Sequence, residues 1–252
     1  GSSSSSPAST ALLGCGRAAF GSGCLLCILS AAGASSRSSE VAAAISFFSS
    51  SCASLAAVCA VRAIADAGHE LGCHGYEHEI LAHFTPEEQL ELLKKAKAAI
   101  EKAAGRAVTG FRMPEGEITE QTLVAAKEAG FAYSSSLSNT DVPYIRQPAG
   151  LPELPISWTL FDLPYFTFAF DPPIPPGSAR SAGMDQVLDN WLCELTGTRR
   201  WGALFSLQLD PQATGEQGRL FMLERVLDEI QKAGDVWLAT GTELAAWTQK
   251  MQ

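Results

Sequence analysis

Two histidines four residues apart, His74 and His78, carry the strongest chemical signal in the sequence. They lie in the stretch 69–79, His-Glu-Leu-Gly-Cys-His-Gly-Tyr-Glu-His-Glu, which holds three of the chain's four histidines. Neutral imidazole nitrogens bind divalent metal ions, and two imidazoles on one tight turn can share an ion. The alternative is a pair of surface histidines in a polar loop, because this spacing arises easily by chance. Residues elsewhere in the chain must decide between the two.

The residues around the pair predict a loop between a strand and a helix. Residues 63–68 have the pattern of a helix end closed by glycine, and residues 69–73 that of a short strand. Residues 85–88, Thr-Pro-Glu-Glu, predict a helix start with a threonine cap, a proline in the first turn and a capping box. The histidines would then follow a strand end, where a rigid scaffold often places reactive groups.

Farther along the chain, predicted strands and helices alternate. Helices are predicted at 85–105, 119–130, 182–195, 216–233 and 242–247. The signals are apolar residues at helical spacing and boundaries marked by glycine or capping residues. Short apolar runs predict strands at 108–112, 131–137, 154–157, 201–209 and 236–240. This alternation predicts a parallel sheet or barrel.

The first 60 residues differ in composition from the rest. They are rich in Ser, Ala, Gly and Cys, and their only charged residues are Arg17, Arg37 and Glu40. We predict that 1–60 is a low-complexity segment outside the native fold, and that 61–252 is the catalytic domain. An apolar run at 23–30 weakly resembles a signal peptide, but otherwise a cytoplasmic location is favoured.

The overall composition limits the partners of the chain. The net charge is −9 and 46% of the residues are hydrophobic, which is ordinary for a globular enzyme. An acidic chain without a basic stripe argues against a nucleic-acid partner. The apolar run at 23–30 is too short to span a bilayer, so we predict no membrane span.

Four segments, taken in order, resemble one family. They are 68–78 around the histidines, 110–116 with Arg-Met-Pro-Glu-Gly, 153–165 with Trp and Asp-Leu-Pro, and 209–240 near the end. They resemble the motifs of the polysaccharide deacetylases, the NodB-homology hydrolases of carbohydrate esterase family 4. The 153–165 stretch is similar to a branch with peptidoglycan-deacetylase-like, allantoinase-like and cyclic-imide-hydrolase-like proteins. The resemblance implies an α/β fold, a distorted (β/α) barrel of the NodB-homology type, incomplete at its N-terminal strand.

The resemblance also implies a metal-dependent hydrolysis of a C–N bond other than a peptide bond. His74 and His78 would bind a divalent metal, most often zinc, which activates a water and polarises the carbonyl under attack. The substrate would be an N-acetyl amide of an amino-sugar polymer, or a small cyclic imide or ureide. Members of this branch tend to be homo-oligomers, and the apolar segment 161–176 is a plausible contact surface.

Further matched residues receive roles by the same resemblance. Arg112 would hold a base aspartate through an ion pair, and the backbone N–H near Glu115 would face the developing oxyanion. Tyr76 would line the substrate pocket. Trp158 and Asp162 would line the pocket or steady a catalytic group, although core packing is an equal alternative for Trp158.

The chain departs from the family pattern at two motifs. The family's first strand ends in paired acids, but no aspartate precedes Asp66 here, and Asp66 falls on the helix before the histidine loop. The family's late His-Pro pair is Asp210-Pro211, so the catalytic acid has changed type. Three hypotheses follow: a hydrolase impaired by a truncated or frame-shifted N-terminus, a degenerate homologue that binds metal or a partner, or a remodelled site. In the last, Asp210, Glu77 or Glu79 would supply replacement oxygen ligands.

Overall fold

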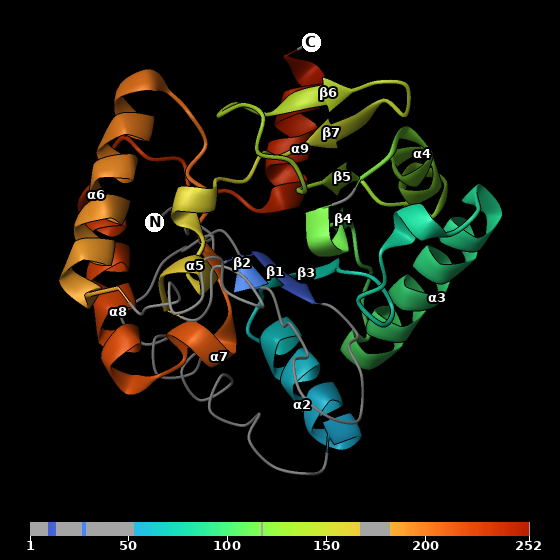
Figure 1. The fold of residues 1–252 in the computed structure, drawn as a ribbon, viewed down its shortest axis with the longest axis horizontal. Coiled ribbons are helices and arrows are strands. Elements are labelled where there is room, and N and C mark those ends of the chain that lie inside the picture. The colour runs from blue at the N-terminus through green and yellow to red at the C-terminus, as the bar shows by residue number, and fades with distance from the viewer. Residues whose placement is uncertain (1–9, 14–26, 29–52, 117, 167–181, 252) are drawn as a thin grey trace, which may run out of the picture.

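The structure is a computed structural model, and it describes residues 10–13, 27–28, 53–116, 118–166 and 182–251 (Figure 1). Strands and helices alternate along much of the chain. The strands are β1 (Thr10–Leu13), β2 (Cys27–Ile28), β3 (Glu70–Cys73), β4 (Gly110–Phe111), β5 (Tyr133–Ser134), β6 (Tyr144–Arg146), β7 (Leu151–Glu153) and β8 (Gln208–Leu209). The α-helices are α2 (Ala53–Asp66), α3 (Pro86–Ala104), α4 (Glu120–Glu128), α5 (Leu163–Phe166), α6 (Met184–Trp201), α7 (Pro211–Thr214), α8 (Gln217–Lys232) and α9 (Gly241–Lys250). The 3-10 turns are η2 (Leu81–His83), η3 (Pro114–Gly116) and η4 (Trp158–Leu160).

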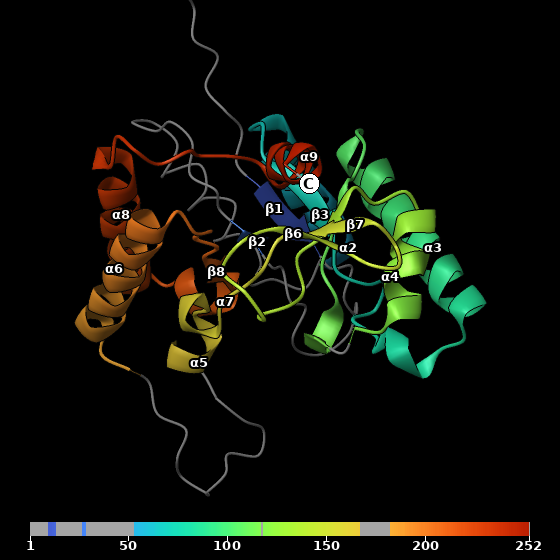
Figure 2. The ribbon, with the colours of Figure 1, turned by 90° about the horizontal axis from the view of Figure 1, so that it is seen from above.

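A six-stranded sheet lies at the centre of the molecule. Its order is β1-β3-β4-β5-β7-β6, and every neighbouring pair is parallel except the β6–β7 hairpin. Strands β2 and β8 form a second, antiparallel pair. Helices α3 and α4 lie on one side of the strands, and α6 and α8 on the other (Figures 1 and 2). The expected α/β architecture with a parallel sheet is therefore confirmed.

Helix α3 shows how the sequence directs a local structure. Thr85 accepts a hydrogen bond from the backbone of Glu88, and the Glu88 carboxylate accepts one from the backbone of Thr85, so the capping box is complete. Gly105 ends the helix with a left-handed φ of 72°. Leu93 and Ala96 on the inward face are fully buried in a core shared with α2, α4, β3 and β4. The predicted boundaries of this helix are confirmed.

Three predicted strands differ in the structure. Helix α6 continues through Trp201, whose side chain is 79% exposed. Within the predicted strand 201–209, only Gln208–Leu209 forms a strand, β8. Residues 236–240 form no strand, and β7 ends at Glu153, before the predicted strand at 154–157. Each run is apolar enough for a strand, but a strand also needs a neighbour at ladder distance, which periodicity cannot report.

The N-terminal part adds a strand that the sequence did not reveal. Strand β1 pairs in parallel with β3, with Leu13 opposite Cys73, but its residues are Thr-Ala-Leu-Leu and include no acid. The boundary predicted after residue 60 falls inside α2, which packs on α3. The division into two regions itself stays a prediction.

Two other predictions concern surfaces of the chain. Residues 167–176, most of the proposed oligomer contact, lie outside the described residues, as does most of the signal-like run, so both stay predictions. Within the described part of the chain, none of the helices is sufficiently long and apolar to pass through a membrane.

Candidate functional site

Buried polar side chains gather at the carboxyl ends of the parallel strands. His74 follows β3, Arg112 follows β4, and Ser135 follows β5. The ends of parallel strands meet at one edge of a sheet, which is where α/β proteins place their ligands. Three further buried polar residues belong to the same region: Ser136, Glu153 and Gln208.

The two histidines lie against each other at this edge. Their ring centroids are 4.9 Å apart and the rings are nearly perpendicular, at 73°. His74 is buried, and its Nδ1 lies 2.9 Å from the carbonyl oxygen of Arg112. A carbonyl only accepts, so Nδ1 carries the proton and Nε2 keeps its lone pair. Burial lowers the pKa of His74 to about 3, so the imidazole is neutral, which is the form that binds metal.

The loop between the histidines is held by its own backbone contacts. Gly75 has a φ of 78°, and a Cβ on it would lie 2.9 Å from Cγ of Pro114, so a larger residue does not fit. The Glu79 carboxylate accepts hydrogen bonds from the backbone N–H of Tyr76 and of Glu77. Glu79 thus closes the turn that presents the histidines.

Arg112 is fully buried and donates to three uncharged acceptors. Its Nε binds the carbonyl of Ser135 at 2.6 Å, its Nη2 binds the Ser135 hydroxyl at 2.7 Å, and its Nη1 binds Oε1 of Gln208 at 2.9 Å. Burial lowers the pKa of Arg112 to about 9. The aspartate that the resemblance pairs with this guanidinium is not among the three partners. The arginine therefore joins β4, β5 and β8, and its role toward a base stays a prediction.

Asp162 and Asp210 organise the turn after β8. The Asp162 carboxylate accepts the backbone N–H of Asp210 at 2.9–3.0 Å and the hydroxyl of Thr214. Asp210 in turn accepts the N–H of Ala213 through Oδ1 at 3.3 Å, as the cap of α7. Burial raises the pKa of Asp162 to about 7, and the neighbouring Asp210 carboxylate adds to the rise. These contacts hold the backbone of the turn and the side chain of Thr214, and the catalytic roles of both aspartates stay predictions.

Glu153 is a buried carboxylate that sequence reasoning did not single out. Its Oε1 accepts the backbone N–H groups of Ser136 and Leu137 at 2.6 and 2.9 Å, and its Oε2 has no hydrogen-bond partner among the described residues. Burial raises its pKa. Its signal in the sequence is an acid inside an apolar strand. Ser135 and Gln208 carry a similar signal, because each is a polar residue at the end of an apolar run.

The remaining candidates lie apart from this polar group. Trp158 in η4 is 58% exposed, which excludes core packing, and its ring lies 6.2 Å from that of Phe161. Tyr76 packs against the core beside α3, with Nζ of Lys95 3.9 Å from the centre of its ring. Glu115 lies in η3, just after Arg112. The pocket and oxyanion roles of these three residues stay predictions.

The described donors do not complete a catalytic metal site. Such sites usually use three protein ligands, and the described residues contain no group of three His, Cys, Asp or Glu side chains that could hold an ion. Asp66 is exposed at the end of α2, before β3 begins, whereas the histidines follow its far end. Glu79 closes the loop and Asp210 caps α7 through Oδ1, and a role of Asp210, Glu77 or Glu79 as a replacement ligand stays a prediction.

The raised pKa of Asp162 predicts a pH-dependent stability. The usual pKa of this carboxyl is 3.8, so between about pH 4 and about pH 7 the folded state binds a proton that the unfolded state does not. The unfolding free energy contributed by this group therefore falls as the pH rises through that window, on the order of 4 kcal/mol in all. Above about pH 7 the contribution of Asp162 to the unfolding free energy no longer changes with pH.

We expect Asp162→Asn to remove this contribution to the slope of unfolding free energy against pH, because asparagine keeps the shape of the side chain without its charge. Urea unfolding at several values from about pH 4 to about pH 8 measures it. Asp189→Asn, an exposed position on α6, is the control and should leave the slope unchanged. A slope in Asp162→Asn equal to that of the unsubstituted chain would contradict the argument.

Comparison with known proteins finds relatives in sequence and in fold. A family model described as Polysaccharide deacetylase matches residues 42–134. The peptidoglycan deacetylase of Helicobacter pylori is 28% identical, over 73% of this chain and 72% of its own length. A solved structure from Mycobacterium smegmatis, assigned to the polysaccharide deacetylases, is 27% identical with a TM-score of 0.72, and the match covers 85% of this chain and 77% of that one. Puue allantoinase shares the fold alone, at 21% identity and a TM-score of 0.60. That match covers 77% of this chain and 63% of the allantoinase.

The family model covers two of the four regions in which motifs were found. The family model includes both the histidine loop and the segment around Arg112. The structure from Mycobacterium smegmatis extends the likeness over most of both chains. The order of the motifs, the parallel sheet and these relatives agree: the chain is similar to the polysaccharide deacetylases, and the family model matches its residues 42–134.

Proposed function

We propose that this chain is a deacetylase-type hydrolase of an N-acetylated amino-sugar polymer whose own activity is strongly reduced. The observation that carries the proposal is the placement of His74. Its Nδ1–H is bound by the Arg112 carbonyl, which leaves Nε2 available beside the ring of His78. Family members are generally metal-dependent, and these two imidazoles are donors that the described part of the chain offers to a divalent ion such as zinc.

The substrate class follows from the relatives. The curated relative from Helicobacter pylori is named for deacetylation of peptidoglycan, an amino-sugar polymer, and is 28% identical. The allantoinase, which would suggest a cyclic ureide, is 21% identical and supports only the fold. These two matches favour an N-acetyl amide over a small cyclic amide as the bond that is hydrolysed.

The reduced activity follows from the groups that hydrolysis needs. Cleavage of an amide requires a base that takes a proton from water and an acid that protonates the leaving nitrogen. Glu40 is the only carboxylate residue before Asp66, so the paired acids of the first motif are absent. Asp210, at the place of the late histidine, uses Oδ1 to cap α7.

A second candidate is a non-catalytic homologue that binds metal or a partner. The hydrogen-bond partners of Arg112 favour it, because among the described residues the guanidinium is bound by the uncharged Ser135 and Gln208 and not by an acid that would serve as base. This candidate and the impaired hydrolase both predict a histidine-dependent metal site. They differ in whether supplying the missing groups produces turnover.

Zinc titration by calorimetry tests the metal part of the proposal. We expect weak binding by the unsubstituted chain, and at least about tenfold weaker binding by His74→Ala and by His78→Ala, because each removes one of the two imidazole donors. His83→Ala is the matched control, since His83 is exposed in η2 just beyond the loop. Equal zinc affinity in all four proteins would refute the site.

A further inference from the structure

A cavity of about 420 Å³ lies between α6, the segments 203–207 and 236–240, and the start of α9. It reaches the amino-end side of the sheet, because Tyr133, the first residue of β5, lines it. The Tyr133 hydroxyl binds the carboxylate of Glu70, the first residue of β3, at 2.9 Å. The histidines follow the other end of β3. Ser135 is the lining residue shared with the candidate site, through its contact with Arg112.

Two walls of the cavity are segments that the sequence predicts as strands. Residues 203–207 and 236–240 are apolar, yet in the structure neither belongs to a strand. Backbone segments that pair directly would leave little room between them, since paired strands lie only about 4.8 Å apart. Clefts and cavities that bind small molecules have volumes of about 300–1,000 Å³. A space of this size is therefore a candidate for a bound molecule.

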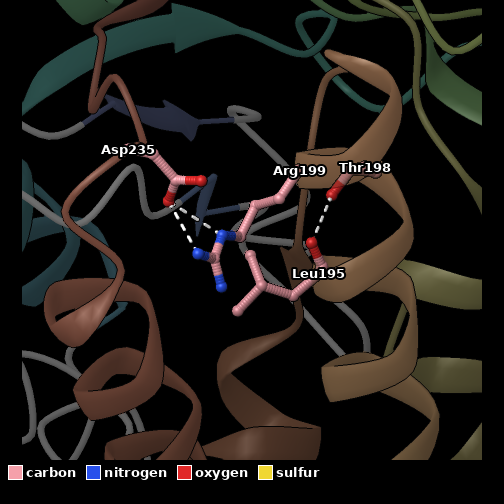
Figure 3. Close-up of polar contacts among 4 residues, drawn as sticks. All are labelled: Leu195, Thr198, Arg199 and Asp235. Atoms are coloured by element: carbon pink, nitrogen blue, oxygen red, sulfur yellow. Dashed lines mark hydrogen bonds and ion pairs between the residues drawn. The ribbon is translucent and has the colours of Figure 1, made fainter.

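The lining of the cavity is mostly apolar. Leucine and isoleucine side chains from five different parts of the chain face it: Leu154, Leu195, Leu204, Leu227, Ile230 and Leu244. Thr198, a polar lining residue, donates its hydroxyl to the carbonyl of Leu195 at 3.0 Å (Figure 3). The same hydroxyl lies 2.9 Å from the carbonyl of Glu194, which belongs to the same helix. Its hydrogen is therefore already used within α6.

The charged groups of the lining neutralise each other. Arg199 and Asp235 form an ion pair, with Nη2 at 2.8 Å and Nε at 2.9 Å from the same carboxylate oxygen (Figure 3). This pair joins the end of α6 to the loop after α8. An anionic ligand would have to compete with Asp235 for the guanidinium. The cavity therefore offers a charged ligand little gain over water.

Two tryptophans contribute aromatic surface to the lining. Trp237 and Trp247 both line the cavity, their ring centroids are 6.3 Å apart, and their planes meet at 66°. Both side chains remain about half exposed, at 56% and 43%. Aromatic rings favour such edge-to-face contacts with other rings, and small-molecule pockets are typically lined by apolar and aromatic side chains.

We propose that this cavity is a binding site for a neutral molecule with two aromatic ring systems. An apolar cavity of roughly 150 Å³ in another protein holds one benzene, so 420 Å³ has room for two rings. The apolar walls and the tryptophan pair match such a ligand, and the paired charges disfavour an ion. The site is separate from the proposed hydrolysis, because it shares with the histidine region only the contact through Ser135.

Fluorescence titration of the full chain with N-phenyl-1-naphthylamine, a neutral two-ring-system probe, tests the proposal. We expect saturable enhancement of probe emission, with energy transfer from the tryptophans. Ala239→Phe, which places a ring inside the cavity, should weaken binding at least about tenfold. Ala98→Phe on the exposed face of α3 is the matched control and should bind as the unsubstituted chain does.

The same titration has outcomes that would overturn the proposal. Absence of saturable binding, or equal affinity in Ala239→Phe and Ala98→Phe, would refute the site. Tighter binding of the anionic 1-anilinonaphthalene-8-sulfonate, lost in Arg199→Gln, would refute the neutral ligand class. If Ala239→Phe does not fold, as judged by circular dichroism, Ala203→Phe fills the cavity from the other wall and applies the same criterion.

Discussion

Substitution of Arg112 by methionine is expected to lower the unfolding free energy by about 3 kcal/mol. Methionine removes a buried charge, which by itself is favourable. It also leaves the Ser135 carbonyl, the Ser135 hydroxyl and Oε1 of Gln208 without their donor. Each buried acceptor left unpaired costs about 1–3 kcal/mol. We expect these losses to exceed the gain, because the guanidinium is bound on three sides.

Urea unfolding followed by the fluorescence of the buried Trp191 and the other tryptophans measures this change. Arg112→Lys should also be destabilised, since one ammonium cannot reproduce the three directed bonds of the guanidinium fork. Arg225→Met is the control, because Arg225 is exposed on α8 and its ion pair with Asp185 is 3.7 Å long. A change within about 0.5 kcal/mol is expected there. Equal or greater stability of Arg112→Met would show that desolvation of the charge dominates.

The elements with strong local signals were predictable from the sequence. The capping box at Thr85 and the glycine at 105 define α3 without reference to the rest of the chain. Strand β3 and the loop with His74 were also placed by local residues, because glycine and polar residues bound them. By contrast, the runs 201–207 and 236–240 depend on a partner strand elsewhere in the chain, and sequence periodicity carries no information about that partner.

The site was predictable only as far as its motifs are local. His74 and Arg112 were singled out by their motifs, and the structure brings them together through the Arg112 carbonyl. Ser135, Glu153 and Gln208 were not singled out, since their importance arises from contacts between residues 17 to 96 positions apart. Serine, glutamate and glutamine are common surface residues, so type alone does not reveal that these three are buried.

The register of β1 with β3 gives a position at which the family's first motif can be tested. Strand β1 ends level with β3, because Leu13 pairs with Cys73, and the next residue after Cys73 is His74. Two acids introduced directly after β1, by Gly14→Asp and Cys15→Asp, are therefore the substitutions that the register favours for the first motif. Asp210→His supplies the family's late residue and removes the carboxylate that helps to raise the pKa of Asp162.

We expect the unsubstituted chain to release little or no acetate from N-acetylglucosamine oligosaccharides in the presence of zinc. The triple variant Gly14→Asp/Cys15→Asp/Asp210→His should release acetate at least about 10²-fold faster. Loss of a general base or acid costs roughly 10²- to 10⁴-fold each, and the chain departs from the family at both places. The matched control, Gly14→Asn/Cys15→Asn/Asp210→His, has similar size without the basic oxygens and should stay slow. Turnover by the unsubstituted chain at about 1 s⁻¹ or faster would contradict the prediction, because a residue such as Asp210 would then already supply the missing base or ligand.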